Sequence, residues 1–335
     1  MADLARLRGR SFLVLGRAGM DLYADPPGTR IEEAGRFVAH LGGSSANIAV
    51  ALVRQGCTAA LVTRVSDDAV GRFCLAQLDA YAVDRTHVRT EGGEARNSLA
   101  VVETRIENCQ SVIYRNGAAD FAMGMEDVEA VDYAQFSALV TTGTVLAAEP
   151  SRSACFRAFD LARKAGLPLI FDVDYRPYSW PSAAMASAVY SRAGALCDVI
   201  VGNDVEFGFM AGDPAKGLDK ARSVIGAGAQ VVVYKMGEKG AITITRTGEV
   251  ATGIYPTRAL KPTGAGDSFL GAFLAGLADG LPVKAVVQRG SAAAAMVVAR
   301  VGCAPAMPTR TVLDCFMATH SPELPEGRDD AHSPA

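Results

Sequence analysis

The 335-residue sequence lacks the features that would place it in a membrane, on nucleic acid or outside the cell. Residues 12–15 form an apolar run that is too short for a signal peptide, and the longest later run, residues 292–299, is too short to span a bilayer. Lysine and arginine form no stripe, and the net charge is only −3, which disfavours a nucleic-acid partner. We therefore expect a soluble, cytoplasmic protein with neither membrane nor nucleic acid as a partner.

Several familiar motifs are also missing. The seven cysteines form no CxxC pair and no Cys/His metal-site spacing, and their number is odd, so we expect reduced and mostly buried thiols. No GxxxxGK[ST] sequence occurs, which excludes a Walker-type phosphate loop. Residues 16–21 follow the first apolar run without GxGxxG spacing, which removes the main support for a Rossmann dehydrogenase.

What is present is a composition typical of helices packed closely on a sheet. Half of the residues are apolar, and 34 are glycine. Short apolar segments alternate with helical ones, which predicts a parallel sheet with helices on both faces. The expected strands are residues 11–15, 58–64, 139–144, 169–172, 199–202 and 230–235. The expected helices are residues 69–80, 151–165, 182–193, 204–211, 283–300 and 309–318. Residues 97–105 with 110–115, and 243–246 with 249–254, are expected to form hairpins.

The most informative stretch is KPTGAGDSFLGAFL, from Lys261 to Leu274. Gly264 and Gly266 allow the backbone to bend so that its N–H groups face outward, at the start of a helix with an apolar face. A helix N-terminus has unpaired N–H donors and a partial positive charge, which suit a phosphate. Asp267 lies in the first turn, so an anion site and a carboxylate base are close together, as phosphoryl transfer to an alcohol requires. Taken alone, the pattern also fits a plain glycine loop with a helix-start aspartate.

A second stretch, HLGGSSANIAV, precedes another helix. Gly42 and Gly43 permit a ligand to approach the backbone, and Ser44 or Ser45 is expected to cap the helix. Asn47 lies in the first turn, and its amide can both donate and accept hydrogen bonds, which suits a polyol.

Together these two motifs resemble those of the ribokinase-like (PfkB) sugar kinases, and the resemblance extends in order over roughly residues 11–318. It implies a ribokinase-like three-layer α/β/α sandwich with a mostly parallel central sheet, as a single domain over residues 1–320. It also implies a small β-sheet lid from about residues 17–40 and 92–118, which includes a lid strand over residues 31–37. In the family the lid often mediates a homodimer. Residues 321–335 are expected to form a disordered tail.

The resemblance implies a reaction that uses ATP and Mg²⁺. The γ-phosphate of MgATP would move to a primary hydroxyl whose proton is taken by Asp267. The backbone amides of Gly264, Ala265 and Gly266 would stabilise charge on the phosphoryl oxygens.

On the nucleotide side, Asn203 and Glu206 match the family's Asn-x-x-Glu pattern, which orders Mg²⁺ and phosphate, often through water. Asn203 could instead be only a helix N-cap. The strand that ends at Lys235 leads into a loop resembling the family's nucleotide loop, in which Gly237 and Gly240 let the backbone lie against ATP. Lys235 would be close to the phosphates.

On the substrate side, Asp21 could hold sugar hydroxyls or be an ordinary turn aspartate. Gly42, Gly43 and Asn47 belong to the family's sugar site. Arg115 could be a solvated hairpin arginine, but its context resembles the acid-sugar kinases, in which a guanidinium grips a carboxylate or keto group. Arg176 could be a surface residue before a proline turn, whereas the resemblance places it near the substrate and the transferred phosphate.

Within the family, five stretches resemble the members that phosphorylate O6 of 5-dehydro-2-deoxy-D-gluconate in inositol breakdown: GRAGMDLYADPPGT, EARNSLAVVETR, VIYRNGAADFAM, DVDYRPYSW and LKPTGAGDSF. Two alternatives stay open. One is another kinase of the family, acting on 2-keto-3-deoxygluconate or on a neutral sugar such as fructose or ribose. The other is a non-catalytic sensor of sugars or nucleotides, against which the intact glycine turn and Asp267 argue.

Lys261 departs from the family pattern. Many relatives have an acidic residue there, which helps to bind a monovalent cation near the anion site. An ammonium group would repel such a cation and supply its charge, so activity is expected to be nearly independent of K⁺.

Overall fold

The computed structural model describes residues 2–324. Nine strands form its main sheet: β1 (Ser11–Leu15), β4 (Thr58–Ser66), β5 (Val88–Glu91), β8 (Ala138–Thr142), β9 (Leu169–Asp172), β10 (Val199–Asn203), β11 (Val231–Lys235), β12 (Ala241–Thr245) and β13 (Gly248–Thr252). Their order is β13-β12-β11-β10-β9-β8-β1-β4-β5. The strands from β11 to β5 run parallel, and β12 and β13 extend one edge antiparallel.

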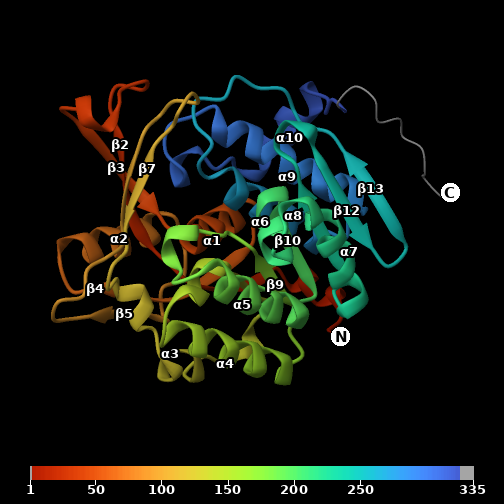
Figure 1. The fold of residues 1–335 in the computed structure, drawn as a ribbon, viewed down its shortest axis with the longest axis horizontal. Helices are drawn as coiled ribbons and strands as arrows, with labels where there is room; N and C mark the ends of the chain where they lie inside the picture. The colour runs from red at the N-terminus through yellow and green to blue at the C-terminus, as the bar shows by residue number, and fades with distance from the viewer. Residues whose placement is uncertain (1, 325–335) are drawn as a thin grey trace.

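Helices cover both faces of this sheet (Figure 1). They are α1 (Ser44–Arg54), α2 (Ala69–Ala80), α3 (Met125–Glu129), α4 (Ser151–Lys164), α5 (Ala183–Leu196), α6 (Asp204–Ala211), α7 (Gly217–Ala227), α8 (Ala265–Ala278), α9 (Val283–Val298) and α10 (Arg310–Thr319). In the described part of the chain, no helix combines the length and the apolar character needed to cross a bilayer.

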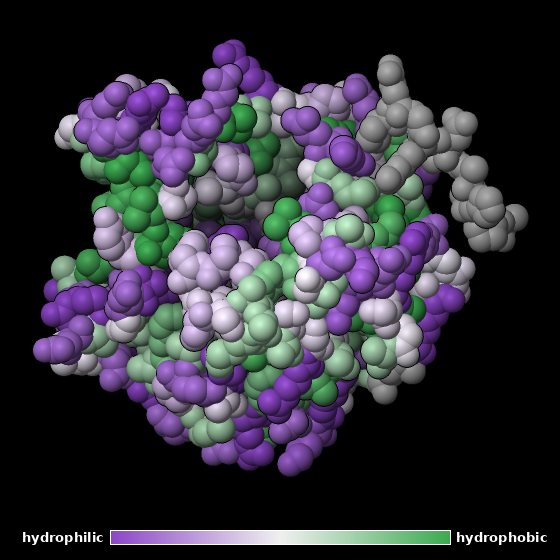
Figure 2. Space-filling model, viewed as in Figure 1, coloured by the Kyte–Doolittle hydropathy of each residue, from purple (hydrophilic) through white to green (hydrophobic). Residues whose placement is uncertain are grey.

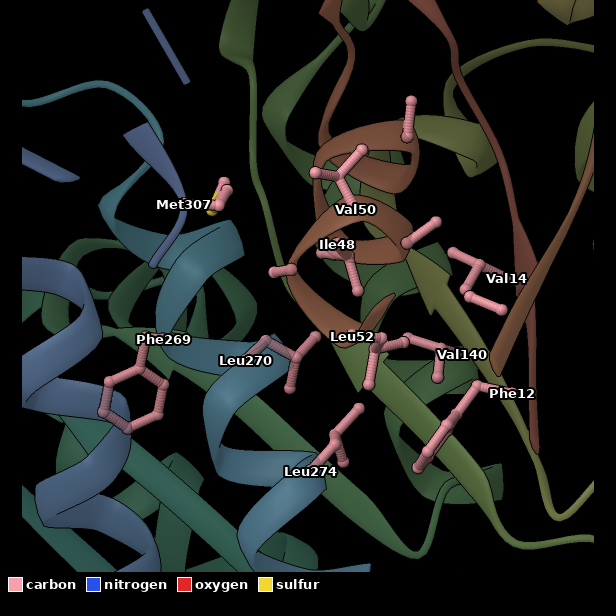
Figure 3. Packing of buried hydrophobic residues seen from close by; sticks show 14 of the residues in the cluster. Phe12, Val14, Ile48, Val50, Leu52, Val140, Phe269, Leu270, Leu274 and Met307 are labelled. Atoms are coloured by element: carbon pink, nitrogen blue, oxygen red, sulfur yellow. The ribbon is translucent and has the colours of Figure 1, made fainter. Parts of the chain in front are cut away.

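Alternation along the buried strands divides the interior into two cores. In β1, Phe12 and Val14 point to one face, whereas Leu13 and Leu15 point to the other. The first core contains residues of α1, α8 and α9, and Figure 3 shows part of it: Ile48 and Leu52 of α1 lie near Leu270 of α8. The second core contains residues of α4 to α7. Each fully buried side chain of this size contributes about 1.5–3 kcal/mol to the free energy of unfolding. Because helices pack on both faces of the main sheet, the expected three-layer α/β/α sandwich is confirmed.

Because the parallel strands point the same way, the residues that follow them meet at one edge of the sheet. This edge receives Arg17 after β1, Thr144 after β8, Asp174 after β9, Asn203 at the end of β10 and Lys235 at the end of β11. The carboxyl edge of such a sheet is where ligands bind in open α/β folds.

A second sheet stands beside the main body, at the left of Figure 1. Its strands are β2 (Gly19–Ala24), β3 (Phe37–Gly42), β6 (Leu99–Val102) and β7 (Ser111–Tyr114), in the order β3-β2-β6-β7. The predicted hairpin between β6 and β7 is confirmed by their antiparallel register. We call this four-stranded sheet the lid. A cavity of about 410 Å³ separates its loops at residues 27–28 and 104–107 from residues 258–260 of the main body.

Two expectations need correction. The predicted lid strand over residues 31–37 is wrong: residues 31–33 form a short 3-10 helix, and the strand begins at Phe37. Charged Glu32 and Glu33 and the following Gly35 are residues that strands disfavour, whereas Phe37 and Val38 are residues that strands favour. The proposed tail from residue 321 is paired at its start, because Glu323 and Ile254 exchange two backbone hydrogen bonds. Residues 325–335 lie outside the described residues.

Candidate active site

Helix α8 begins with the glycine turn singled out in the sequence. Gly264 is the N-cap with φ +82°, a conformation that favours glycine, and a Cβ there would lie 2.7 Å from Sγ of Cys303. The first backbone bond of the helix is donated by the N–H of Ser268 to the carbonyl of Gly264 at 3.1 Å. The N–H groups of Gly264, Ala265 and Gly266 come before this bond and are available to an anion.

Asp267 lies within this first turn, and its partner comes from α1. Nδ2 of Asn47 donates a hydrogen bond to Oδ2 of Asp267 over 3.0 Å. Burial, and next the charge of Asp174, raise the pKa of Asp267 to about 7, although the bond from Asn47 acts in the opposite direction. A carboxylate with this pKa can accept a proton near neutral pH and release it again, as a general base must.

Asp174, which the sequence interpretation did not single out, is the second carboxylate of the site. Its φ of +36° is unusual for a residue other than glycine. Its oxygens accept bonds from Oγ of Ser44 at 2.6 Å and from Nη2 of Arg176 at 2.7 Å. Burial alone would raise the pKa of Asp174, but the Arg176 guanidinium and the Ser44 hydroxyl outweigh it, so the pKa is lowered and the group is ionised.

The expected serine cap of α1 is wrong. The N-cap is Gly43, and both serines lie inside the helix. The hydroxyl of Ser44 donates to Asp174, and that of Ser45 donates to the carbonyl of Leu15 at 3.2 Å. Both hydroxyls thus bond to groups outside the helix, and neither accepts a hydrogen bond from the N–H groups at the start of α1.

Gly42 and Gly43 make room for groups of the protein itself. A Cβ on Gly42 would lie 1.9 Å from Oδ1 of Asp21, and one on Gly43, whose φ is +92°, would lie 2.4 Å from the carbonyl oxygen of Arg17. Asp21 lies on β2 and is buried, which raises its pKa, while Arg17 opposes the shift. The two glycines therefore bring the lid and the start of α1 close together.

The nucleotide-side residues lie at the ends of β10 and β11. Asn203 is the N-cap of α6: its Oδ1 accepts from the N–H of Glu206 at 2.8 Å, and Oε2 of Glu206 accepts from the N–H of Asn203 at 2.7 Å. Asn203 thus caps helix α6. Lys235 points toward α8, because a Cβ on Gly266 would lie 3.6 Å from its Nζ. The Lys235 ammonium therefore lies beside the available amides.

Gly237 and Gly240 lie in the turn between β11 and β12, with φ of +57° and +77°. A Cβ on Gly240 would lie 2.1 Å from the carbonyl oxygen of Thr252, so this glycine is required by packing at the sheet edge. Within residues 2–324, no hydrogen bond or ion pair joins this turn to Asp267 or its partners.

The two predicted arginines are already engaged. Arg115 is not a solvated hairpin residue: it is buried, Nε and Nη2 donate to Asp120, and Nη1 donates to the carbonyl of Thr144 at 2.9 Å. Its guanidinium also lies 3.9 Å from the ring centre of Phe121. Arg176 is 44% exposed but bound to Asp174.

Lys261 is fully buried under the glycine turn, and its Nζ donates to the carbonyl oxygen of Thr263. Burial lowers the pKa of Lys261, while the nearby Cys303, Asp267 and Asp21 oppose the change. A positive charge here lies next to the residues that open the anion site.

Of the sequence-predicted residues, the structure brings together Asp267, Asn47, Arg176, Lys235, Lys261 and the Gly264–Gly266 turn. The sequence interpretation missed Arg17, Ser44, Asp174 and Asp172. Burial raises the pKa of Asp172, the charge of Lys235 opposes this change, and the neighbouring Asp174 adds to it. A usable signal was present for the aspartates, since DVDYR places two carboxylates at and just beyond the end of a strand. Figure 2 shows that the surface is hollowed between the lid and the helices of the first core. Within the described chain, no group of three or more His, Cys, Asp or Glu side chains is arranged to hold a metal ion.

Comparison with known proteins shows the family to which this chain belongs. Residues 10–310 match the pfkB family carbohydrate kinases, and the chain belongs to this family. It is therefore a carbohydrate kinase, as the two glycine motifs predicted.

Individual relatives narrow the resemblance. The chain is 36% identical over 314 residues to the 5-dehydro-2-deoxygluconokinase of Geobacillus kaustophilus, covering 92% of this chain and 94% of that protein. It is 37% identical over 317 residues to the 5-dehydro-2-deoxygluconokinase of Photobacterium profundum, with coverage of 93% and 96%. Among solved structures, a fructokinase with bound ATP from Xylella fastidiosa shares the fold, with a TM-score of 0.82, 20% identity and coverage of 93% and 99%.

Proposed function

We propose that this carbohydrate kinase transfers the γ-phosphate of ATP to the O6 hydroxyl of 5-dehydro-2-deoxy-D-gluconate, a step of myo-inositol degradation. The relatives that carry this substrate in their name match the chain over more than nine-tenths of its length. The observation that carries the proposal is the position of Asp267, within one helical turn of three available backbone amides and beside the ammonium of Lys235.

In the proposed mechanism, Asp267 accepts the proton of the sugar's O6 hydroxyl. The O6 oxygen bonds to the γ-phosphorus of ATP while the bond between that phosphorus and the leaving ADP breaks. Asn47 holds Oδ2 of Asp267, which leaves Oδ1 to face the hydroxyl. The amides of Gly264, Ala265 and Gly266 stabilise charge that develops on the phosphoryl oxygens. Preorganised donors of this kind are each worth about 10²–10³ in kcat.

ATP is proposed to lie along Asn203, Lys235, Gly237 and Gly240. Mg²⁺ would offset phosphate charge and would be held mainly by phosphate and water, as this ion prefers. Glu206 fits a contact through water. Each of its carboxylate oxygens accepts one backbone N–H, from Asn203 at 2.7 Å and from Tyr175 at 3.3 Å, and each keeps a lone pair for a water molecule.

On the sugar side, we propose that Asp21 and Asn47 contact hydroxyl groups next to the Gly42–Gly43 turn. Arg176 would approach the substrate and the transferred phosphate, where its 44% exposed side chain can reach them while it remains paired with Asp174. Arg115 stays a proposed contact through the N–H groups that Asp120 and Thr144 leave unused.

Lys261 is proposed to replace the monovalent cation of related enzymes. Its ammonium is buried and donates to Thr263, one residue before the Gly264 cap. A fixed charge at this place would order the turn without any bound ion.

A homodimer through the lid is also proposed. Phe37 and Val38 on β3 and Val112 and Tyr114 on β7 are 37–60% exposed, and apolar surface gathers on this part of the molecule (Figure 2). Burying such a patch between two copies would remove it from water. All seven cysteines are unpaired thiols, which supports a reducing, cytoplasmic setting.

The test is an ADP-release assay with purified protein, MgATP and a panel of sugars and keto-sugar acids. Turnover confined to 5-dehydro-2-deoxy-D-gluconate is the expected result. Preference for 2-keto-3-deoxygluconate, fructose or ribose would reject the substrate while keeping the kinase. No turnover on any of them would reject the proposed reaction and favour a sensor.

A further inference from the structure

Arg17 is a buried cation that the proposed mechanism does not use. It follows β1 by two residues, and its carbonyl oxygen accepts a bond from the N–H of Ala46 at 3.2 Å. Gly43 packs against the same carbonyl with no room for a Cβ. The backbone of Arg17 is therefore fixed at the start of α1, on the carboxyl edge of the sheet.

The side chain of Arg17 has little to bind. Only 8% of the residue is exposed, Nη1 donates to Oγ of Ser98 at 3.1 Å, and the buried Nε has no partner. Among residues 2–324, Arg17 forms no ion pair within 4.0 Å. Removing a guanidinium from water costs several kcal/mol unless a partner compensates, so an incompletely paired buried arginine is unusual.

Three carboxylates surround Arg17 without contacting it. Its charge opposes the raised pKa values of Asp21 and Asp267 and helps to lower that of Asp174. Asp21 belongs to the lid, Asp174 to the segment after β9 and Asp267 to α8, so the guanidinium lies within electrostatic reach of all three parts of the site. Its unused donors are available to a ligand that enters between them.

The other two arginines differ in this respect. Arg115 gives three bonds to Asp120 and Thr144, and Arg176 is bound to Asp174. Each has an acidic partner within the protein. Arg17 alone of the three is buried with its charge unmatched by a contacting carboxylate.

We infer that Arg17 binds the carboxylate of the sugar acid and sets the preference for an acid over a neutral sugar. The inference deepens the proposed function and rests on it. In the substrate, the carboxylate and the O6 hydroxyl are at opposite ends of a six-carbon chain. With O6 at Asp267, the acid end must meet a cation elsewhere in the same cleft, and a guanidinium offers a carboxylate two parallel bonds.

The test compares the sugar acid with its uncharged amide, which keeps the same hydroxyl groups. Dissociation constants for both are measured by calorimetry, and kcat and KM by ADP release, for the wild type, Arg17→Gln, Arg17→Lys and Arg115→Gln. We expect Arg17→Gln to weaken binding of the acid about 30- to 1000-fold. The wild type should bind the acid more tightly than the amide, and in this variant the ratio of the two dissociation constants, called the acid-to-amide ratio, should come close to one. KM should change more than kcat. Arg17→Lys should restore part of this acid-to-amide ratio. Arg115→Gln should weaken acid and amide alike and so keep the ratio, since we assign the proposed contact of Arg115 to the keto group that both ligands share.

The outcomes separate the two proposals. If Arg17→Gln weakens acid and amide equally, Arg17 only balances the neighbouring carboxylates, and the inference fails while the proposed function stands. The same holds if Arg115→Gln abolishes the ratio and Arg17→Gln does not. If the wild type prefers the amide or neutral sugars, both proposals fail. Thermal unfolding shows whether each variant is folded. Calorimetry gives the ratio of the dissociation constants of acid and amide even for a variant that has no turnover.

Discussion

The two walls of the cleft are built in different ways. The inner wall consists of strand ends and the first turns of α1 and α8, and several of its polar groups, such as Asn47 and Asp267, are buried and held by specific bonds. The outer wall is the lid, whose short strands expose Phe37, Val112 and Tyr114. The difference teaches that core packing fixes the candidate catalytic groups, whereas few contacts within one chain constrain the exposed surface of the lid. Substitutions should therefore have large effects on the inner wall and small ones on the lid.

The largest effect is expected from Asp267→Asn. It removes the proposed base but keeps an acceptor for the bond from Asn47, so kcat should fall about 10²–10⁴-fold. The folded pKa near 7 lies above the usual unfolded value of about 3.9, so the folded state holds a proton more tightly, and stability falls as pH rises between these values. The variant should consequently unfold at a higher temperature than the wild type at pH 8 and not at pH 4. Near-normal turnover would reject the role of Asp267.

Gly264→Ala should damage both stability and activity. The left-handed φ of +82° and the 2.7 Å approach to Cys303 together should cost about 2–4 kcal/mol of unfolding free energy. Gly226→Ala is the matched control, since that glycine is inside α7 with nothing within 4 Å of an added Cβ. It should leave stability unchanged or raise it by about 0.5–1 kcal/mol. Urea unfolding measures both, and equal effects would contradict the close fit at Gly264.

Lys261→Met tests the fixed charge beneath the anion site. The wild type should show equal activity in K⁺ and in choline, because we propose that the Lys261 ammonium, bonded to Thr263, supplies the charge of the cation. The variant should lose about 10-fold in kcat and regain part of it in K⁺, as expected for one lost electrostatic contact near the phosphate. Strong activation of the wild type by K⁺ would show that Lys261 does not replace the ion.

Asp174→Asn probes the coupling between the two carboxylates. Since a protonated Asp267 would not act as the proposed base, kcat/KM should rise with pH through a midpoint near 7. Removing the Asp174 charge should lower that midpoint by roughly one pH unit. Asp219→Asn, at a side chain that is 77% exposed, should leave it in place. An unchanged midpoint in Asp174→Asn would mean that burial alone raises the pKa of Asp267.

The smallest effect on folding is expected at the lid. Val112→Glu, on β7, should change the unfolding free energy of one chain by less than about 0.5 kcal/mol. It should nevertheless convert a lid-mediated dimer to monomers, as measured by sedimentation. Val312→Glu, at a similarly exposed position on α10, should leave the oligomer unchanged. A dimer that survives Val112→Glu would place the contact elsewhere.

Much of the fold could be predicted because its elements are strongly patterned. The bounds of β1, β9, α2 and α6 agree with the expected residues. Helix α7 was not predicted, since Ala221 and Val224 are its few buried apolar residues and glycines begin the helix and interrupt it. Local sequence cannot reveal such an element, because packing against α6 and β11 compensates for its weak propensity.

The residues of the candidate site also fall into those that the sequence could predict and those that it could not. Asp267 and Asn47 were predicted because each follows a glycine turn at the start of a helix. The burial of Arg115 could not be predicted from the sequence. It depends on bonds to Asp120 and to the carbonyl of Thr144, and only the folded chain brings these groups next to the guanidinium. Asp174 was missed for a related reason, as its left-handed backbone and its bond from Ser44 depend on the approach of α1 to β9.

The bond between Asn47 and Asp267 joins residues 220 positions apart. At a synthesis rate of about 5–20 residues per second, roughly 10–45 s pass between the emergence of the two residues from the ribosome. Helix α1 spends that interval without α8, whose Gly271 would otherwise pack against Ala51 so closely that a Cβ would lie 2.3 Å away. We therefore expect nascent chains that end before residue 265 to expose the apolar face of α1. These unfinished chains should bind a holdase chaperone more strongly than chains released after α8.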